Sequence, residues 1–208
     1  MKKSFAWFVS IILICSCMSA YAADVSAFEA HAAIDLTPFK DEFYSASFDD
    51  VSYDATISAP NIEIETSNTT SSRRTYTESF TLYPRIKMSA LLGVEIFSPE
   101  IGFYTGDYTS LGGFRIVIGE NRYLLSADNT SSSQYGCSGT IAIGKSLLKE
   151  MLSTELPVKF CVAGSTNYIH EFTSDELEIL RHYVNDLETV GLLDSFSDDK
   201  VIVVTNYN

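Results

Sequence analysis

A capping box near the C-terminus locates one amphipathic helix. In the pattern Thr173-Ser174-Asp175-Glu176, the Thr hydroxyl and the Glu carboxylate pair with backbone N–H groups that a helix start leaves unsatisfied. Gly191 is a natural end for this helix. Between these signals, apolar residues recur at helical spacing on one face: Leu177, Leu180, Val184 and Leu187. Such a helix must bury its apolar face against another layer of structure.

The segments around this helix supply that layer. A shorter helix is predicted from about Lys145 to Ser153, with Leu147, Leu148, Met151 and Leu152 directed inward. Apolar or alternating runs predict strands at 140–143, 158–162, 168–172 and 201–204. The order after about residue 126 is therefore strand, helix, hairpin, helix, strand.

Strands dominate before residue 126. Alternation predicts strands at 57–65 and 76–87, the second with Pro84 at an edge or a bulge. Residues 114–118 and 123–125 form a hairpin around Gly119-Glu120-Asn121. The polar tracts 66–72 and 128–134 lack apolar residues and are interpreted as exposed loops, while 89–109 has no clear pattern. We expect an α+β fold: a mostly antiparallel β-sheet with two helices packed on one face in the C-terminal third.

The first 22 residues have the features of a secretory signal peptide. Two lysines precede the apolar run 5–14, and Ala20-Tyr21-Ala22 places small residues where a signal peptidase cleaves. The run is too short for a stable membrane anchor, which needs about 20 residues. We predict cleavage after Ala22 and a single exported α+β domain over 23–208, in the periplasm or fully secreted, without a membrane span. The alternative is a lipid anchor at Cys17, in a loose lipobox.

Cleavage would leave two cysteines, Cys137 and Cys161. An even pair in an exported chain favours a disulfide, which would close a loop of about 25 residues and contribute roughly 3 kcal/mol. The alternatives are a buried free thiol and a reactive cysteine.

The charge is strongly negative and unevenly placed. Lys and Arg number 14 against 27 Asp and Glu, a formal net charge of −13. Residues 24–65 hold ten acids and one base, and residues 171–199 hold nine acids and one base. Such a chain is repelled by phosphate backbones, which argues against a nucleic-acid partner. The two acidic ends either fold together into a surface for a cationic protein, or lie apart as a solvated exterior.

No motif predicts a catalytic, cofactor-binding or metal-binding residue. The string 139–146, GTIAIGKS, matches a phosphate-binding loop, but Thr-Ile-Ala-Ile favours extended structure and no apolar strand precedes it. We interpret it as a strand, a turn at Gly144 and a helix start. The three histidines, His31, His170 and His182, lack metal-ligand spacing and are expected to be structural or solvated.

Two functions from different classes fit this profile. The first is a non-enzymatic periplasmic protein that binds another protein through an acidic surface, as an accessory or immunity-like module would. The second is an envelope hydrolase that uses two carboxylates, one from each acidic end, as general acid and base.

Overall fold

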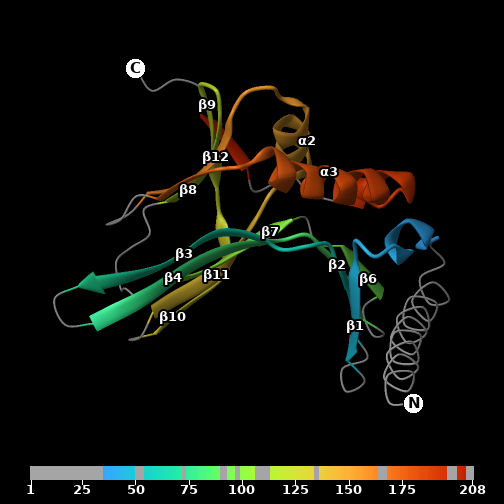
Figure 1. Cartoon of the computed structure of the whole chain (residues 1–208), viewed down its shortest axis with the longest axis horizontal. Coiled ribbons are helices and arrows are strands. Elements are labelled where there is room, and N and C mark those ends of the chain that lie inside the picture. The colour runs from blue at the N-terminus through green and yellow to red at the C-terminus, as the bar shows by residue number, and fades with distance from the viewer. Residues whose placement is uncertain are drawn as a thin grey trace, which may run out of the picture.

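The computed structural model describes residues 35–49, 54–71, 74–89, 93–96, 99–105, 113–133, 136–163, 168–195 and 201–204 (Figure 1). The predicted signal peptide and His31 lie outside these residues. The helices are η1 (Thr37–Lys40), α2 (Lys145–Ser153), α3 (Ser174–Thr189) and η2 (Leu193–Ser195), of which η1 and η2 are 3-10 helices. The strands are β1 (Ser45–Asp49), β2 (Asp54–Ser58), β3 (Ile62–Ser71), β4 (Arg74–Tyr83), β5 (Arg85–Ser89), β6 (Gly93–Ile96), β7 (Glu100–Thr105), β8 (Gly113–Ile118), β9 (Asn121–Leu125), β10 (Ala127–Ser133), β11 (Gly136–Ala142), β12 (Val158–Ala163), β13 (Tyr168–Glu171) and β14 (Val201–Val204).

The strands of the described residues form three antiparallel sheets. Sheet A has the order β1-β2-β5-β6, sheet B β10-β11-β7-β4-β3 and sheet C β13-β12-β8-β9-β14. This confirms the expected α+β class with mostly antiparallel strands and two α-helices. The strands are distributed over three sheets, however, where the sequence suggested one.

Prolines mark the place where the chain passes between sheets A and B. The predicted strand 76–87 divides at Pro84 into β4 of sheet B and β5 of sheet A, because proline has no N–H with which to continue a ladder. The predicted strand 57–65 divides in the same way around Pro60, into β2 and β3. The two crossings lie side by side, since the Ala59 amide donates to the Pro84 carbonyl at 3.0 Å.

Both tracts interpreted as exposed loops are in fact strands. Residues 66–71 continue β3, and residues 128–133 belong to β10. These are the two edge strands of sheet B, so each tract has a ladder on one side only. Backbone pairing with the neighbouring strand overrides the turn-favouring composition, which is why a polarity argument missed them.

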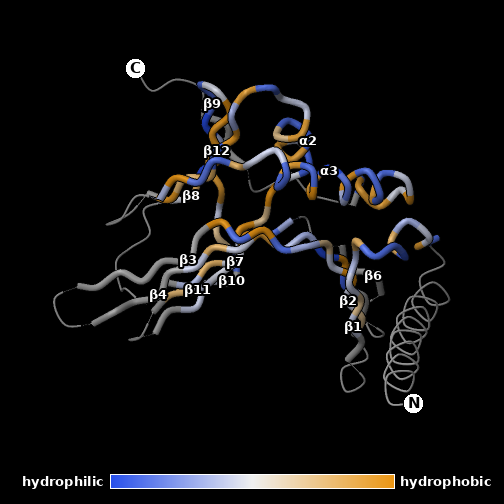
Figure 2. Tube along the Cα trace, viewed as in Figure 1, coloured by the Kyte–Doolittle hydropathy of each residue, from blue (hydrophilic) through white to orange (hydrophobic). Residues whose placement is uncertain are grey.

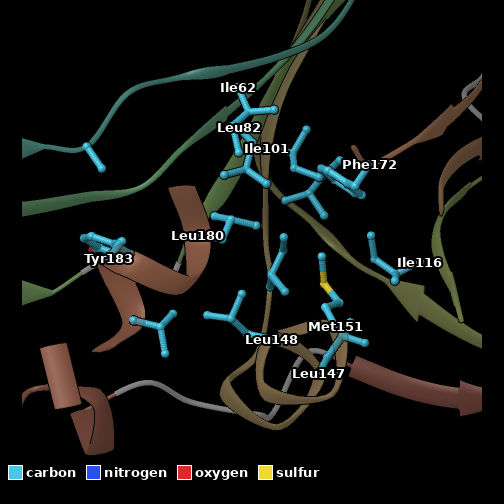
Figure 3. Packing of buried hydrophobic residues seen from close by; sticks show 14 of the residues in the cluster. Ile62, Leu82, Ile101, Ile116, Leu147, Leu148, Met151, Phe172, Leu180 and Tyr183 are labelled. Atoms are coloured by element: carbon cyan, nitrogen blue, oxygen red, sulfur yellow. The ribbon is translucent and has the colours of Figure 1, made fainter. Parts of the chain in front are cut away.

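Sheets B and C pack against each other through aromatic rings. Phe80 of β4 lies 5.9 Å from Phe160 of β12, and Phe103 of β7 lies 5.0 Å from Phe114 of β8, between ring centroids. The helices extend this core with Leu147, Leu148, Met151, Leu180 and Tyr183 (Figure 3). Val184 and Leu187 of α3 are buried as well. Burying one such side chain contributes about 1.5–3 kcal/mol, so the core holds the helices against the sheets.

The predicted helix boundaries are confirmed. The capping box at α3 is complete: the Glu176 amide donates to the Thr173 hydroxyl at 3.2 Å and the Thr173 amide to the Glu176 carboxylate at 2.7 Å. Gly191 has a φ of 74°, a left-handed conformation that ends the helix. The hairpin of β8 and β9 is also confirmed, with its turn at Gly119 and Glu120.

Candidate functional site

The segment from η1 to Tyr44 packs beside α3. Two short-range bonds shape it: the Thr37 amide donates to Asp35 at 2.9 Å, and the Phe43 amide donates to Asp41 at 3.0 Å. The resulting turns direct the rings of Phe43 and Tyr44 against the helix. Figure 1 shows η1, in blue, beside the end of α3.

Five side chains meet there, and together they are called the His182 cluster: Asp41, Phe43, Tyr44, His182 and Asp186. His182 and Asp186 lie one turn apart on α3, with 3.3 Å between His182 Nε2 and the Asp186 carboxylate. The carboxylate of Asp41, in the segment after η1, lies 3.6 Å from the same nitrogen. The Phe43 ring stacks on the imidazole at 4.1 Å between centroids, and the Tyr44 hydroxyl donates to Asp186 at 2.5 Å.

The cluster is buried on its Tyr44 side and open on its Asp41 side. The side chains of Asp41 and His182 are 49% and 41% exposed, against 19% for Asp186. Burial and the Asp186 carboxylate raise the pKa of Tyr44 well above its ordinary value, so the phenol remains a donor. Asp186 is thereby held in place, while Asp41 and the imidazole edge remain accessible to a polar or cationic group.

The cluster joins the two acidic ends of the sequence. Asp41 comes from the first acidic tract and Asp186 from the second, so the two tracts meet at this point of the described structure. Four carboxylates in this region are together called the η1–α3 acidic surface: Asp35, Asp41, Glu42 and Asp186. The cationic or basic groups of this surface are Lys40 and His182.

The other flank of α3 is closer to neutral. Two carboxylates of α3 and one of η2 pair with cations there: Glu178 with Arg181, Glu188 with Lys149 at 3.4 Å, and Asp194 with Lys145 at 2.9 Å. Pairing with the Lys145 ammonium holds the pKa of Asp194 below its usual value. Neighbouring cations therefore offset these three carboxylates.

His170 has a structural position, as predicted. It lies opposite Phe160 in the ladder of sheet C, and its Nε2 is 3.2 Å from the same Glu176 carboxylate that closes the capping box. Its ring also meets Phe172 edge-on. His170 thus ties the start of α3 to β13. His182 is 41% exposed, in line with the expectation of a solvated residue. Of its two partners, Asp186 lies at the local i, i+4 spacing, whereas Asp41 is too distant in sequence for spacing to reveal.

The two cysteines lie on different sheets, and both are free thiols in this structure. Cys137 on β11 packs against the core. Cys161 on β12 alternates with the buried residues Val158, Phe160 and Val162, so it points to the opposite face of sheet C. The predicted bridge is not formed here, and a disulfide between these positions stays a prediction for the exported protein.

Residues 139–146, which match a phosphate-binding loop in sequence, instead form the strand, turn and helix start that their residue types predicted. Residues 139–142 are extended in β11, and α2 begins at Lys145 after Gly144. Lys145 bonds Asp194, and a Cβ on Gly139 would come within 2.9 Å of the Phe103 ring. Gly139 therefore serves close packing between neighbouring strands.

Within the described ranges, no group of three or more His, Cys, Asp or Glu side chains could hold a metal ion. None of the helices described is long and apolar enough to cross a membrane.

The fold and site thus define a three-sheet α+β protein with an acidic, histidine-containing surface at one helix. No family model, curated protein sequence or solved structure matches the chain.

Proposed function

We propose that the protein is exported to the periplasm and binds a cationic partner protein through the η1–α3 acidic surface. The observation that carries this proposal is the meeting of both acidic tracts at His182, with Asp41 and Asp186 on one imidazole nitrogen. Accessible carboxylates next to an aromatic ring suit Lys and Arg, which pair with carboxylates and pack on ring faces. Phe43 supplies such a ring, one face of which is already stacked on His182.

The net charge of the chain also favours a cationic partner. A net charge of −13 attracts a basic protein over the distance of a Debye length, about 10 Å at 0.1 M salt, and the local surface then selects the docking geometry. Asp186 is fixed by Tyr44 and so loses little side-chain freedom on binding, which favours affinity.

The test is affinity capture of the C-terminally tagged chain from the envelope fraction of its host. We expect a basic protein to be retained at low salt and released as salt rises. Asp41→Asn combined with Glu42→Gln should weaken the affinity of that purified partner by about tenfold or more, since each accessible charge contributes mainly to encounter and pairing.

The matched control removes the same charge elsewhere. Glu63→Gln combined with Glu120→Gln alters exposed carboxylates on sheets B and C, away from α3. This control should bind like the wild type. Equal losses in both double variants, or binding that is insensitive to salt, would contradict the proposed surface.

Export itself is tested by the mass of the protein recovered from the envelope. A chain that begins at Ala23 supports cleavage after Ala22, and a lipid-modified Cys17 supports the anchored alternative. A full-length chain contradicts both.

A second candidate is the envelope hydrolase. Asp41 and Asp186 bring one carboxylate from each acidic end to the same imidazole, which supports this function in a modified form. The Asp186 oxygen that contacts His182 also accepts the Tyr44 hydroxyl, so Asp41 and His182 would act on the substrate while Asp186 positions the ring. Loss of hydrolysis of envelope material in Asp41→Asn, with partner capture unchanged, would favour this function over binding.

A further inference from the structure

The outer face of sheet C carries a second surface, of opposite charge. Along β12, Val158, Phe160 and Val162 are buried against the core, so Lys159 and Cys161 point away from it. The ladder extends these two positions into rows across the sheet, since directly paired residues share a face. One row contains Glu171, Lys159, Val117 and Arg122, and the next contains Ile169, Cys161, Arg115 and Leu124. These eight residues are called the sheet C outer face.

Cations outnumber acids on this face by three to one: Arg115, Arg122 and Lys159 against Glu171. The balance is the reverse of that in the whole chain, which has 14 basic and 27 acidic residues. Burial raises the pKa of the Cys161 thiol. All three cations lie close enough to Cys161 to lower that pKa, although their effect is smaller than that of burial. Ladder register and electrostatics thus agree that the positive charge is concentrated around one point.

Exposed apolar side chains accompany this charge. Ile169 is 70% exposed and Leu124 is 37% exposed. They are two of the four large exposed apolar side chains recorded in the described residues. An exposed apolar group with a charged rim is typical of a protein-binding surface.

The helices and sheet B lie on the other side of sheet C. The contacts of Phe160 with Phe80 and of Phe114 with Phe103 place sheet B against the inner face. Tyr123 of β9 donates to Glu150 of α2, which places that helix on the inner face too. Figures 1 and 2 show α2 and α3 on one side of β8 and β12, and no described element covers the other side.

We infer that the sheet C outer face docks the η1–α3 acidic surface of a second copy of this chain. The inference rests on the acidic surface of the proposed function and names a further partner for it. The two surfaces are complementary in charge. Lys159 pairs with Glu171 at 3.0 Å, so the sheet C outer face keeps an excess of two positive charges. These would meet three carboxylates that are open to solvent, Asp35, Asp41 and Glu42. Because the two surfaces are different, the contact is heterologous and joins chains head to tail.

Because of the net charge of the chain, formation of this contact should depend on the salt concentration. Two copies of a chain with a charge of −13 repel at long range, and salt screens that repulsion over about 8 Å at physiological ionic strength. The paired surfaces attract at shorter range, and Ile169 and Leu124 add an apolar contact that salt does not weaken. We therefore expect association at physiological salt, and a smaller degree of it at very low salt.

The test is complementation between two variants of the exported protein. Arg122→Gln with Lys159→Gln removes the basic charge, and Asp41→Asn with Glu42→Gln removes the acidic charge. Neutral replacements keep the two altered surfaces from attracting each other. In sedimentation across a concentration series, the wild type should form oligomers of increasing size, and each double variant alone should remain a monomer. An equimolar mixture of the two variants should form a one-to-one dimer that grows no further, because each partner retains only the surface that the other lacks.

Cys161 supplies a readout at the contact itself. In reduced protein, alkylation of Cys161 should slow severalfold as the wild-type concentration rises, while Cys137 on sheet B serves as the internal reference. Glu63→Lys reverses an exposed acid on sheet B and should leave both association and Cys161 protection unchanged.

The outcomes separate this inference from the proposed function. A wild type that stays monomeric at every concentration overturns the inference. If that monomer still captures a basic protein that Asp41→Asn with Glu42→Gln loses, the proposed function stands alone. If it instead captures an acidic protein that only Arg122→Gln with Lys159→Gln loses, the sheet C outer face belongs to that protein and the second copy is excluded.

Discussion

The hydroxyl of Tyr44 donates a hydrogen bond to Asp186, 142 positions further along the chain, with 2.5 Å between the oxygens. The bond fastens the segment after η1 to α3 and fixes the carboxylate that contacts His182. Because Tyr44 is buried and Asp186 is largely so, neither group has ready access to water as a substitute partner. The geometry of the His182 cluster therefore depends on this one bond.

Tyr44→Phe should lower the free energy of unfolding by about 1.5–3 kcal/mol, the range for a hydrogen bond to a charged group. Urea denaturation at neutral pH measures the change. Tyr104→Phe is the matched control, because Tyr104 on β7 is 44% exposed and should change stability little. Equal effects of the two substitutions would mean that the bond to Asp186 adds nothing to stability.

Thr173→Ala should cost about 1 kcal/mol, because it removes the acceptor for the Glu176 amide and opens the capping box. The neighbouring exposed Ser174 gives the control, since Ser174→Ala keeps the box intact. Thermal unfolding of both variants, compared with the wild type, measures the difference. A Thr173 variant as stable as the Ser174 variant would show that the cap is not needed.

The buried hydroxyl of Tyr183 should make the free energy of unfolding fall at alkaline pH. Its fully buried hydroxyl donates to the Arg85 carbonyl at 2.8 Å, and burial raises its pKa well above the ordinary value near 10. Because the pKa of Tyr183 is raised in the folded state, its contribution to stability is present in full below pH about 10. Above that pH the contribution is lost, as the phenol of the unfolded chain releases its proton.

The expected loss from Tyr183 approaches about 1.4 kcal/mol per pH unit above that point. Tyr183→Phe should be less stable at pH 7 by about 1 kcal/mol, for the missing hydrogen bond, and should lose stability less steeply in alkali. Unfolding free energies from pH 8 to 11 test this. Parallel curves for the two proteins would mean that another group controls alkaline unfolding.

The helices and the local hairpin could be predicted from sequence because their signals are local. The capping box, Gly191 and the spacing of Leu180 and Leu187 all lie within one helix, and each is satisfied within it or next to it. Tyr183 shows the limit of this reasoning: its buried position depends on the carbonyl of Arg85, 98 positions away.

Division into three sheets could not be read from alternation. A period of two identifies a strand but not the sheet to which it belongs, and Pro84 separates two strands whose apolar pattern is continuous. The candidate site was missed for a related reason. Asp41 and His182 are brought together only by tertiary packing of η1 on α3, and neither carries a local motif.

Gly139→Ala should destabilise the protein by about 1–3 kcal/mol, the usual cost of overpacking. Its Cβ would lie 2.9 Å from the Phe103 ring and 3.1 Å from the Asp128 carbonyl oxygen, and that backbone atom cannot easily move. Gly102→Ala is the comparison, since its Cβ would meet the Tyr83 side chain, which can rotate away. A larger cost at Gly102, measured by urea unfolding, would contradict this account of the glycine in the phosphate-loop string.

Cys161 should be a slow thiol at neutral pH. Burial raises its pKa, and the positive charges of Arg115, Lys159 and Arg122 only partly offset that effect. Because the thiolate is the nucleophile, the rate of alkylation should rise with pH through a midpoint above the ordinary value of about 8.5. Peptide mapping of reduced, dilute protein follows Cys161 separately from the other cysteines.

Arg115→Gln should raise that midpoint further, because it removes the charge that most favours the thiolate. Arg181→Gln makes the same charge change on α3, where Arg181 pairs with Glu178, and should leave the midpoint in place. A midpoint at or below that of a free cysteine, or the same shift in both variants, would contradict the position of Cys161 among these cations. The same mapping without reductant tests the predicted bridge, since a disulfide between Cys137 and Cys161 would leave both positions unlabelled.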